Sequence, residues 1–391
     1  MGKWEMVRLG DVCKIVSGAT PSTSNPELWN GDIKWVTPAE ISDGSYFIYD
    51  TERHISEKAG LKPMPAGTVL LSSRAPIGKV AITGEPMCCN QGFKNLICSD
   101  RIHNRFLYRY LKNKTAYLNS LGRGSTFKEI SKSIVEDVQI PLPPLPIQQK
   151  IADVLDLAST LIEKRKAQIA RLDLLVKSKF IEMFGDPVVN PRKWTQKQLG
   201  EVLERKASNG FFAKNHEYSN DGNSQVMWVG DVVNRMYSNT TSLRKINVSK
   251  NDVKKYEVQY GDLLFCRSSL NVDGIGKASM VPKNVRPKTL FECHIIRTTL
   301  NLSVCLPEFI QVLTTTNGFR SQILSKAKTA TMTTIGQDGI CSNTIYLPPL
   351  KLQAHFAYFT NLVDASKNEL QQGLKELELL YKSLMQKYFQ G

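Results

Sequence analysis

The feature that most constrains this chain is an internal repeat. Residues 140–184 align without a gap with residues 345–389, at a constant offset of 205. The two blocks are identical at 14 of 45 positions, far above chance. The identical pairs are Ile140/Ile345, Leu142/Leu347, Pro143/Pro348, Pro144/Pro349, Leu145/Leu350, Gln148/Gln353, Ala152/Ala357, Leu157/Leu362, Leu172/Leu377, Leu174/Leu379, Leu175/Leu380, Lys177/Lys382, Ser178/Ser383 and Phe184/Phe389. A repeat of this kind decides the organisation of the whole fold.

The segments that precede the two blocks are related more loosely. Residues 4–12 resemble residues 194–202, and Ile77-Gly78-Lys79 resembles Ile275-Gly276-Lys277. The offset drifts from 190 to 198 between these landmarks, so insertions separate them. The chain therefore has the plan variable–constant–variable–constant. A constant part indicates a shared framework or partner, and a diverged part indicates two different targets.

Each constant block predicts one long helix. The blocks begin with proline clusters, which are favoured just ahead of a helix. Apolar residues then recur at spacings of three and four, as in an amphipathic helix with a near-heptad seam. This stripe comprises Ile151, Leu155, Ala158, Ile162, Ile169, Leu172, Val176, Phe180 and Met183, and then Leu352, Phe356, Phe359, Val363, Leu370, Leu374, Leu377, Tyr381, Leu384 and Tyr388. We expect helices of about 57 Å that pair with each other; the alternative is that each stripe packs only on its own domain.

The variable parts predict two α+β domains, so the fold class is α+β. Short β-type runs separated by turn signals predict a mostly antiparallel sheet in each domain. These runs are 33–36, 68–72, 80–83, 95–98, 226–229, 262–266 and 294–298, with helical patterns at 105–120 and 307–326. The predicted domains are residues 1–146 and 187–349, and the helical blocks are residues 147–186 and 350–391.

The charge balance indicates a polyanionic partner. The chain has 51 Lys and Arg against 36 Asp and Glu, a net charge of +15, which is typical of a nucleic-acid-binding protein. The alternative is a basic but merely solvated surface. No apolar run approaches the roughly 18 residues of a membrane helix, so we expect no membrane contact. The eight cysteines contain no CxxC pair, which favours reduced thiols in a cytoplasmic protein and no metal site.

No catalytic motif is found. Gly78-Lys79 lacks the upstream glycine of a Walker A loop, and Gly122-Arg123-Gly124 does not continue as a dinucleotide-binding motif. The Asn-Pro-Pro-aromatic signature of DNA amino-methyltransferases and the HExxH motif are both absent. The five histidines are scattered, and a lone histidine is more often structural than catalytic. We therefore expect no catalysis by this chain itself.

The notable residues are hydrogen-bond donors on loops, at matching places in the two domains. Arg can form two hydrogen bonds with the edge of a guanine, and Asn or Gln can do so with the edge of an adenine. Lys, Ser and Thr commonly bind phosphates. The candidate DNA-binding residues are Ser72, Ser73, Arg74, Lys79, Asn90, Gln91, Lys94, Arg123, Thr126 and Lys128 in the first domain, and Arg267, Ser268, Ser269, Asn271, Lys277, Lys328, Thr331 and Thr333 in the second. The alternative is that these are ordinary solvated loops.

The chain resembles the specificity subunits of type I restriction–modification systems. The resemblance lies in Leu142-Pro143-Pro144-Leu145-x-x-Gln148-Gln149-x-Ile151-Ala152, in its second copy, and in the two domain openings at Trp4 and Trp194. It covers essentially the whole chain, including the order of its parts. The second copy departs from the pattern because Ala354 replaces the second glutamine.

The resemblance implies two target-recognition domains, each reading one half of an asymmetric, bipartite sequence of double-stranded DNA. It also implies that the helices pair as an antiparallel coiled coil whose length sets the spacing between half-sites. Two methyltransferase subunits would dock on the repeated blocks, and two restriction (motor–nuclease) subunits would join for cleavage. The candidate partner-binding residues are Pro144, Leu145, Gln148, Gln149, Pro349, Leu350 and Gln353.

The cofactors that the resemblance implies belong to the partner subunits. S-adenosylmethionine, Mg²⁺ and ATP are expected there, and none is expected in this chain. Two alternatives remain at the level of the sequence: a nuclease that acts alone with a degenerate active site, and a coiled-coil adaptor whose basic charge is incidental.

Overall fold

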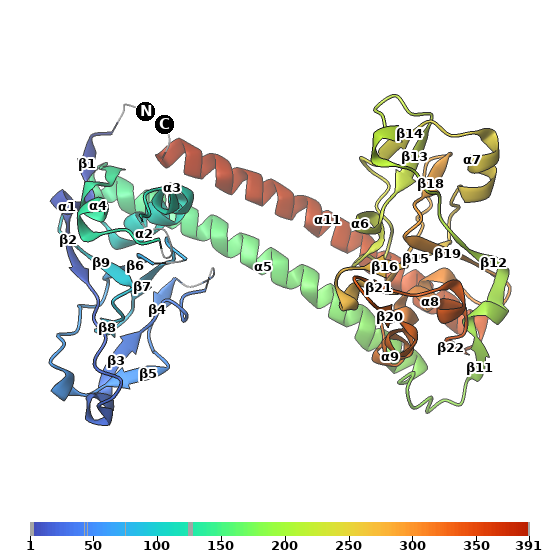
Figure 1. Ribbon diagram of the computed structural model, residues 1–391, viewed down its shortest axis with the longest axis horizontal. Coiled ribbons are helices and arrows are strands. Elements are labelled where there is room, and N and C mark those ends of the chain that lie inside the picture. The colour runs from blue at the N-terminus through green and yellow to red at the C-terminus, as the bar shows by residue number, and fades with distance from the viewer. Residues whose placement is uncertain (1–3, 43, 45, 75, 124–127, 390–391) are drawn as a thin grey trace. The chain divides into compact units, whose positions relative to one another are not determined.

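The protein folds into two compact units. The computed structural model describes residues 4–42, 44, 46–74, 76–123 and 128–389. Residues 1–166 and 372–391 form unit 1, and residues 167–371 form unit 2. Each unit contains one diverged domain, called domain 1 or domain 2 below, and segments of both long helices (Figure 1).

Domain 1 is an α+β domain with mostly antiparallel strands (Figure 1). Its strands are β1 (Met6–Arg8), β2 (Cys13–Ser17), β3 (Trp29–Val36), β4 (Phe47–Ile48), β5 (Arg53–Ile55), β6 (Val69–Ser72), β7 (Val80–Thr83), β8 (Cys88–Cys89), β9 (Phe93–Cys98) and β10 (Gln139–Pro141). Its helices are α1 (Leu9–Val12), α2 (Asn104–Asn113), α3 (Thr115–Ser120) and α4 (Lys132–Asp137). The two larger sheets have the orders β2-β9-β6-β7-β4 and β5-β3-β8, in which β4–β7 and β3–β8 are parallel pairs.

Domain 2 repeats this plan with insertions. Its strands are β11 (Thr195–Gln198), β12 (Leu203–Asn209), β13 (Ser224–Met227), β14 (Arg244–Ile246), β15 (Leu263–Cys266), β16 (Ser268–Ser269), β17 (Ala278–Met280), β18 (Thr289–Phe291), β19 (Ile295–Leu300), β20 (Lys328–Thr329), β21 (Thr333–Thr334) and β22 (Thr344–Leu347). Its helices are α6 (Val229–Val232), α7 (Lys250–Tyr256), α8 (Pro307–Thr314), α9 (Asn317–Lys326) and α10 (Gln337–Cys341). Its sheets of three or more strands have the orders β12-β19-β15-β17, β14-β13-β18 and β16-β21-β20.

The strand predictions are confirmed to within a few residues. The run 226–229 ends as a strand at Met227, because Val229 begins α6. Each predicted helical pattern is two helices rather than one. In domain 2 the break follows Thr314, where the Thr315 and Thr316 hydroxyls donate to the carbonyls of the preceding turn. Such local hydrogen bonds compete with helix continuation.

Each domain is closed by a short ladder between its first and last strands. In domain 1, β1 pairs antiparallel with β10, with Val7 opposite Ile140. In domain 2, β11 pairs antiparallel with β22, with Gln196 opposite Tyr346. The chain therefore enters and leaves each domain at one place, directly before the proline cluster that starts the long helix.

The two repeated blocks form the helices α5 (Leu145–Phe184) and α11 (Leu350–Phe389). Each has 40 residues, which corresponds to about 60 Å. Every residue of the predicted apolar stripe is buried or half-buried, so the predicted seam is confirmed.

Within each unit the start of one helix packs against the end of the other. In unit 1, Ile151 and Leu155 of α5 share a core with Met385 and Phe389 of α11. In unit 2, Phe180 and Phe184 of α5 share a core with Phe356 of α11. The helix segments are therefore antiparallel in both units, as expected. The same two cores contain most of the apolar side chains of the adjoining domain.

A buried ion-pair network fastens domain 1 to α5. Arg109 Nη2 lies 2.6 Å from Asp156 Oδ1, and the Tyr46 hydroxyl donates to Asp156 Oδ2 at 2.7 Å. Burial and this hydrogen bond raise the pKa of Tyr46 above its ordinary value. Unit 2 has the same arrangement without the charge, because Tyr237 donates to Asn361, the repeat partner of Asp156, at 2.5 Å.

We predict that Asp156→Asn lowers the free energy of unfolding by about 3 kcal/mol, because Arg109, 6% exposed, then loses its counter-charge. Denaturant unfolding of the full chain measures this loss. Asp153→Asn is the matched control, since Asp153 pairs with Arg105 while 55% exposed and its loss costs within about 1 kcal/mol. Equal effects of the two substitutions would contradict a special role for Asp156.

Candidate nucleic-acid interface

Two of the predicted loops of domain 1 meet at one carboxylate. Arg74 Nε donates to Glu129 Oε2 at 2.9 Å, and Lys94 Nζ lies 3.3 Å from Glu129 Oε1. Main-chain hydrogen bonds of 2.9 and 3.0 Å join Arg123 to Glu129, and Ile130 N–H donates to Ser73 O. The segments around Arg74 and Arg123, far apart in the sequence, therefore lie side by side.

Glu129 was not among the predicted residues, although it sets the charge of this site. Burial raises the pKa of its carboxyl, but the hydrogen bonds from Arg74 and Lys94 lower it further, so the net shift is downward. The carboxylate is thus held ionised and fixes the direction of the Arg74 guanidinium. Its position directly after the basic loop 122–128 was the available sequence signal.

Domain 2 builds the same junction from hydroxyls. Strand β21 lies between β16 and β20, and Thr334 is opposite both Ser268 and Lys328. This is the pattern that Glu129 makes with Arg74 and Arg123 in domain 1. Thr334 therefore takes the place of Glu129 and Ser268 that of Arg74, so the junction of domain 2 lacks the ion pair of domain 1.

A third predicted segment, Asn90–Gly92, forms a turn beside the junction of domain 1. Asn90 Oδ1 accepts the Gly92 N–H at 2.7 Å, and Asn90 Nδ2 donates to Thr20 Oγ1 at 3.1 Å. The Gly92 carbonyl accepts the Ser73 N–H at 2.7 Å. The turn is thereby anchored to the loop that carries Arg74.

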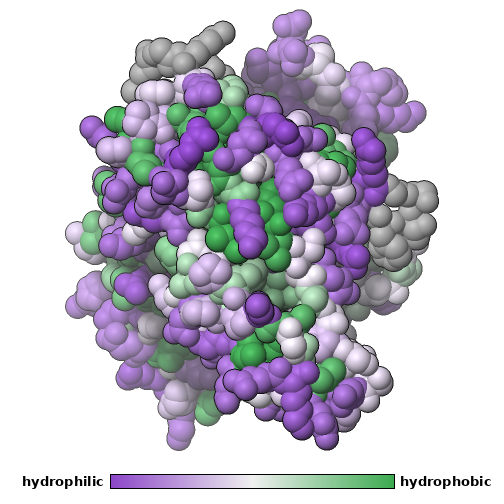
Figure 2. All heavy atoms as spheres, turned by 90° about the vertical axis from the view of Figure 1, so that its left-hand side faces the viewer, coloured by the Kyte–Doolittle hydropathy of each residue, from purple (hydrophilic) through white to green (hydrophobic). Residues whose placement is uncertain are grey.

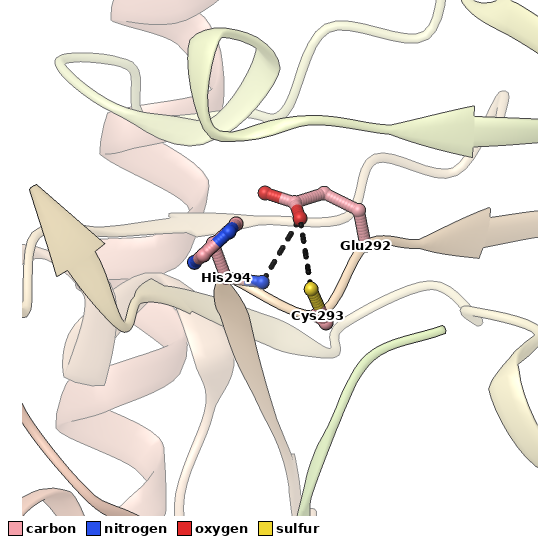
Figure 3. Close-up of side chains that lie close together, drawn as sticks. All are labelled: Glu292, Cys293 and His294. Atoms are coloured by element: carbon pink, nitrogen blue, oxygen red, sulfur yellow. Dashed lines mark hydrogen bonds between the residues drawn. The ribbon is translucent and has the colours of Figure 1, made fainter. Parts of the chain in front are cut away.

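The equivalent turn of domain 2 is Glu292-Cys293-His294, which the sequence reasoning missed. Glu292 Oε2 accepts the His294 N–H at 2.9 Å, and the His294 carbonyl accepts the Arg267 N–H at 2.7 Å. Figure 3 shows the Glu292 carboxylate turned back over the loop toward the His294 main-chain nitrogen and the Cys293 sulfur. The available signal was its place directly ahead of β19, as Asn90–Gly92 precede β9.

These three residues are also the one group of three potential metal ligands found among the described residues, with ligand atoms within 4.8 Å of one another. The Glu292 carboxylate already accepts from the His294 N–H and from the Cys293 thiol, the latter at 3.6 Å. Burial and the Glu292 charge raise the pKa of Cys293, which favours the thiol over the thiolate that metals require. The geometry is that of a hydrogen-bonded turn.

Several predicted residues lie inside the domains. Ser72 and Ser73 are 0% exposed, and the Ser72 hydroxyl donates to Pro76 O and accepts the Lys79 N–H. Lys94, Ser268 and Thr333 are also buried. Their hydrogen bonds shape the loops, so the structure places them beneath the surface rather than on it.

The remaining predicted residues divide into anchored and exposed groups. Lys79 donates to Pro38 O, Arg267 to Cys293 O, and Lys277 to Asn234 Oδ1. The Ser269 hydroxyl accepts the Asn271 N–H. The exposed group comprises Arg74, Gln91, Arg123, Lys128, Asn271, Lys328 and Thr331, together with His294. Thr126 lies outside the described residues.

The face of the molecule drawn in Figure 2 is mostly hydrophilic, with hydrophobic side chains gathered in a smaller central area. Among the described residues, no helix combines the length and apolarity needed to cross a membrane.

The repeated glutamines Gln148 and Gln353 have a role inside the protein. Both are 0% exposed. Gln148 Oε1 accepts the His103 N–H at 2.8 Å, and its amide nitrogen donates to Pro143 O at 2.8 Å. Gln353 makes the same pair of bonds, to Leu306 N–H at 2.8 Å and Pro348 O at 2.7 Å. Each glutamine clamps the start of a long helix to its own domain and presents no surface to a partner.

The other predicted partner residues, Pro144, Leu145, Gln149, Pro349 and Leu350, are exposed. All of them except Gln149, whose repeat partner is Ala354, belong to a larger set of repeat-identical residues that face solvent in both copies. This set comprises Pro144/Pro349, Leu145/Leu350, Leu157/Leu362, Leu174/Leu379, Leu175/Leu380, Lys177/Lys382 and Ser178/Ser383. Leu157 and Leu174 are 62% and 61% exposed, and their partners Leu362 and Leu379 are 52% and 68% exposed. Apolar identities on a surface indicate a shared binding partner rather than a shared core.

We predict that Gln148→Ala lowers the free energy of unfolding by about 1–3 kcal/mol, because the His103 N–H and the Pro143 carbonyl lose their buried partner. The adjacent, exposed Gln149 is the matched control, and Gln149→Ala changes this free energy by less than about 0.5 kcal/mol. Denaturant unfolding of both variants measures the difference. An unchanged free energy of unfolding in Gln148→Ala would contradict this structural role of Gln148.

Comparison with known proteins finds similarity to one family. Residues 1–171 match the family model of the type I restriction modification DNA specificity domain. The MjaIX specificity subunit of Methanocaldococcus jannaschii is 39% identical over 51% of this chain, and the chain spans about half, 52%, of that relative's length. The EcoKI specificity subunit of Escherichia coli is 25% identical over 99% of this chain and 89% of its own.

Two solved structures share the fold. The S subunit of a type I restriction–modification system from M. genitalium matches with a TM-score of 0.61 at 13% identity, over 99% of this chain and 96% of its own. A chain from a structure of a type I R-M system matches with a TM-score of 0.57 at 19% identity, over 99% and 98%. The predicted fold class, two α+β domains with two long helices, is thereby confirmed.

Proposed function

We propose that this chain is a specificity subunit of a type I restriction–modification system, in which each domain reads one half of an asymmetric bipartite DNA site. The observation that carries this proposal is the repeated junction of loops. Its framework is the same in both domains, but its exposed chemistry differs. Domain 1 offers Arg74 beside Glu129, whereas domain 2 offers Lys328 beside Thr334.

The neighbouring turns support two different half-sites. Domain 1 presents Gln91, an amide that pairs with an adenine edge. Domain 2 presents His294 over a buried Glu292. One backbone plan with two sets of donors and acceptors fits two different base sequences.

The long helices fix the spacing between the half-sites and dock two methyltransferase subunits. The support for docking is the set of repeat-identical, exposed residues around Leu157/Leu362 and Leu174/Leu379, which offers one surface twice. Two identical partners fit two copies of one surface. The support for spacing is the length of the helices and their fastening to both domains through Gln148, Gln353, Phe184 and Phe389.

The chemistry belongs to the partners in this proposal. The methyltransferase subunits bind S-adenosylmethionine and methylate adenine, and two restriction subunits bring Mg²⁺- and ATP-dependent activity. This chain supplies recognition and assembly and no catalysis of its own.

Base-resolution mapping of adenine methylation in the source genome, with and without this gene, tests the proposal. We expect deletion to remove methylation from one bipartite, asymmetric motif, because a single chain carries both readers. Restoring the gene restores the motif. An unchanged methylation pattern, in cells that express the gene and a methyltransferase partner, would contradict the proposal.

We predict that Arg74→Ala and Arg267→Ala each relax discrimination at one half-site only, because each arginine lies in a different domain. A base contact of this kind contributes about 1–3 kcal/mol of discrimination. Competition binding with sites substituted in either half measures the effect. Lys62→Ala, an exposed change away from the junction, serves as control. Equal loss at both half-sites would refute the two-reader arrangement.

A further inference from the structure

Unit 2 contains a cavity of about 380 Å³ between domain 2 and the long helices. Five cationic side chains line it, and Asp173 is the only carboxylate among its described lining residues. The cations are Lys177 of α5, Arg235, Lys277, Arg320 of α9 and Lys367 of α11. We call this cavity the basic recess.

Most of the positive charge in the basic recess is uncompensated. Lys367 pairs with Asp173 at 2.5 Å. Lys277 donates to the neutral amide of Asn234 at 2.7 Å, and Arg320 Nη1 donates to the carbonyl of Ile275 at 2.6 Å. Lys177 and Arg235 are exposed, and neither has a carboxylate partner within 4.0 Å among the described residues.

A cavity of unit 1 that is lined by domain 1 and both long helices, about 470 Å³, is electrostatically balanced. Its Arg109 pairs with Asp156 at 2.6 Å, and its Lys166 lies 3.5 Å from Glu163 and 3.7 Å from Glu378. The repeat relates only one edge of the two cavities, where Asp173 and Glu378 occupy matching positions. Asp156 and Glu163 of the unit 1 cavity match Asn361 and Asn368, which line a neighbouring cavity of unit 2. The excess of cations therefore distinguishes the basic recess from the balanced cavity of unit 1.

We propose that the basic recess binds a phosphate of the DNA backbone next to the half-site read by domain 2. Clustered cations without counter-charges repel one another, and an anion relieves that repulsion. Lys277 connects the recess to the proposed reading surface, because it ends the loop that begins at Arg267 after β15. This inference rests on the proposed function and adds to it a contact from a long helix, through Lys177.

The contact positions the DNA and carries no base information. Lys and Arg held on phosphates fix the orientation of a duplex, whereas sequence is read at base edges. The basic recess therefore gives domain 2 a backbone anchor that the balanced cavity of unit 1 does not provide. The two half-sites contribute unequally to the salt dependence of binding.

The test uses the full chain and a mixed-sequence duplex, with Lys177→Gln and Arg235→Gln made singly and together. Both side chains are exposed and unpaired among the described residues, so the substitutions leave the fold intact. We expect each to make the slope of log affinity against log salt shallower by about 0.9. The loss is equal on duplexes of different sequence, because phosphate contacts do not read bases.

Lys382→Gln is the matched control, since Lys382 is the repeat partner of Lys177, is equally exposed, and does not line the balanced cavity. We expect its slope to equal that of the unaltered chain. If the chain binds DNA and all variants give the same slope, the proposed phosphate contact in the basic recess is wrong, whereas the proposed function is not affected. A chain that binds no DNA would refute the proposed function itself. Loss of methyltransferase assembly in Arg235→Gln, which lies outside the repeat-identical surface, together with an unchanged slope would mean that an acidic protein segment, and not DNA, occupies the recess.

Discussion

The structure depends on an exchange of helix ends between the two copies of the repeat: the end of α11 is buried in domain 1, and the end of α5 is buried in domain 2. Phe389, at the end of α11, packs on Phe106 of domain 1 with 5.3 Å between ring centroids. Phe184, at the end of α5, packs on Phe309 of domain 2 at 4.7 Å. Neither domain completes its core with its own segment alone. The antiparallel pairing of helix segments therefore follows from the same contacts that stabilise the domains.

A symmetric framework carries asymmetric charge. Asp156 in the first half corresponds to the neutral Asn361 in the second half, and Glu129 corresponds to Thr334. The basic recess and the balanced cavity of unit 1 also differ in their charge. Apolar and main-chain contacts define the fold that the two halves share, because their strength depends on close packing and hydrogen-bond geometry. Charges at the edges of those contacts are free to diverge, and they distinguish what each half binds.

The sequence predicted the elements well and the loops only in outline. Periodicity placed the helical stripe and most strands, because burial on one face imposes a regular spacing of apolar residues. The loops were recognised as matching, but their convergence on Glu129 was not. A carboxylate among cations has no periodicity, and only the folded chain brings Arg74, Lys94 and Glu129 together. The turn at Glu292–His294 was missed because its residue types differ from those of Asn90–Gly92, although the two turns occupy equivalent places in their domains.

The amino-acid sequence by itself determined that the chain has two equivalent halves, two long amphipathic helices and a basic surface. The tertiary structure decided what the repeated residues do. Gln148 and Leu157 are both identical between the copies, yet Gln148 is 0% exposed and Leu157 is 62% exposed. A residue that is identical in both copies has the same surroundings in both, either in the core of the protein or at a surface that binds a partner. Burial separates the two cases, and burial depends on contacts between residues far apart in the sequence.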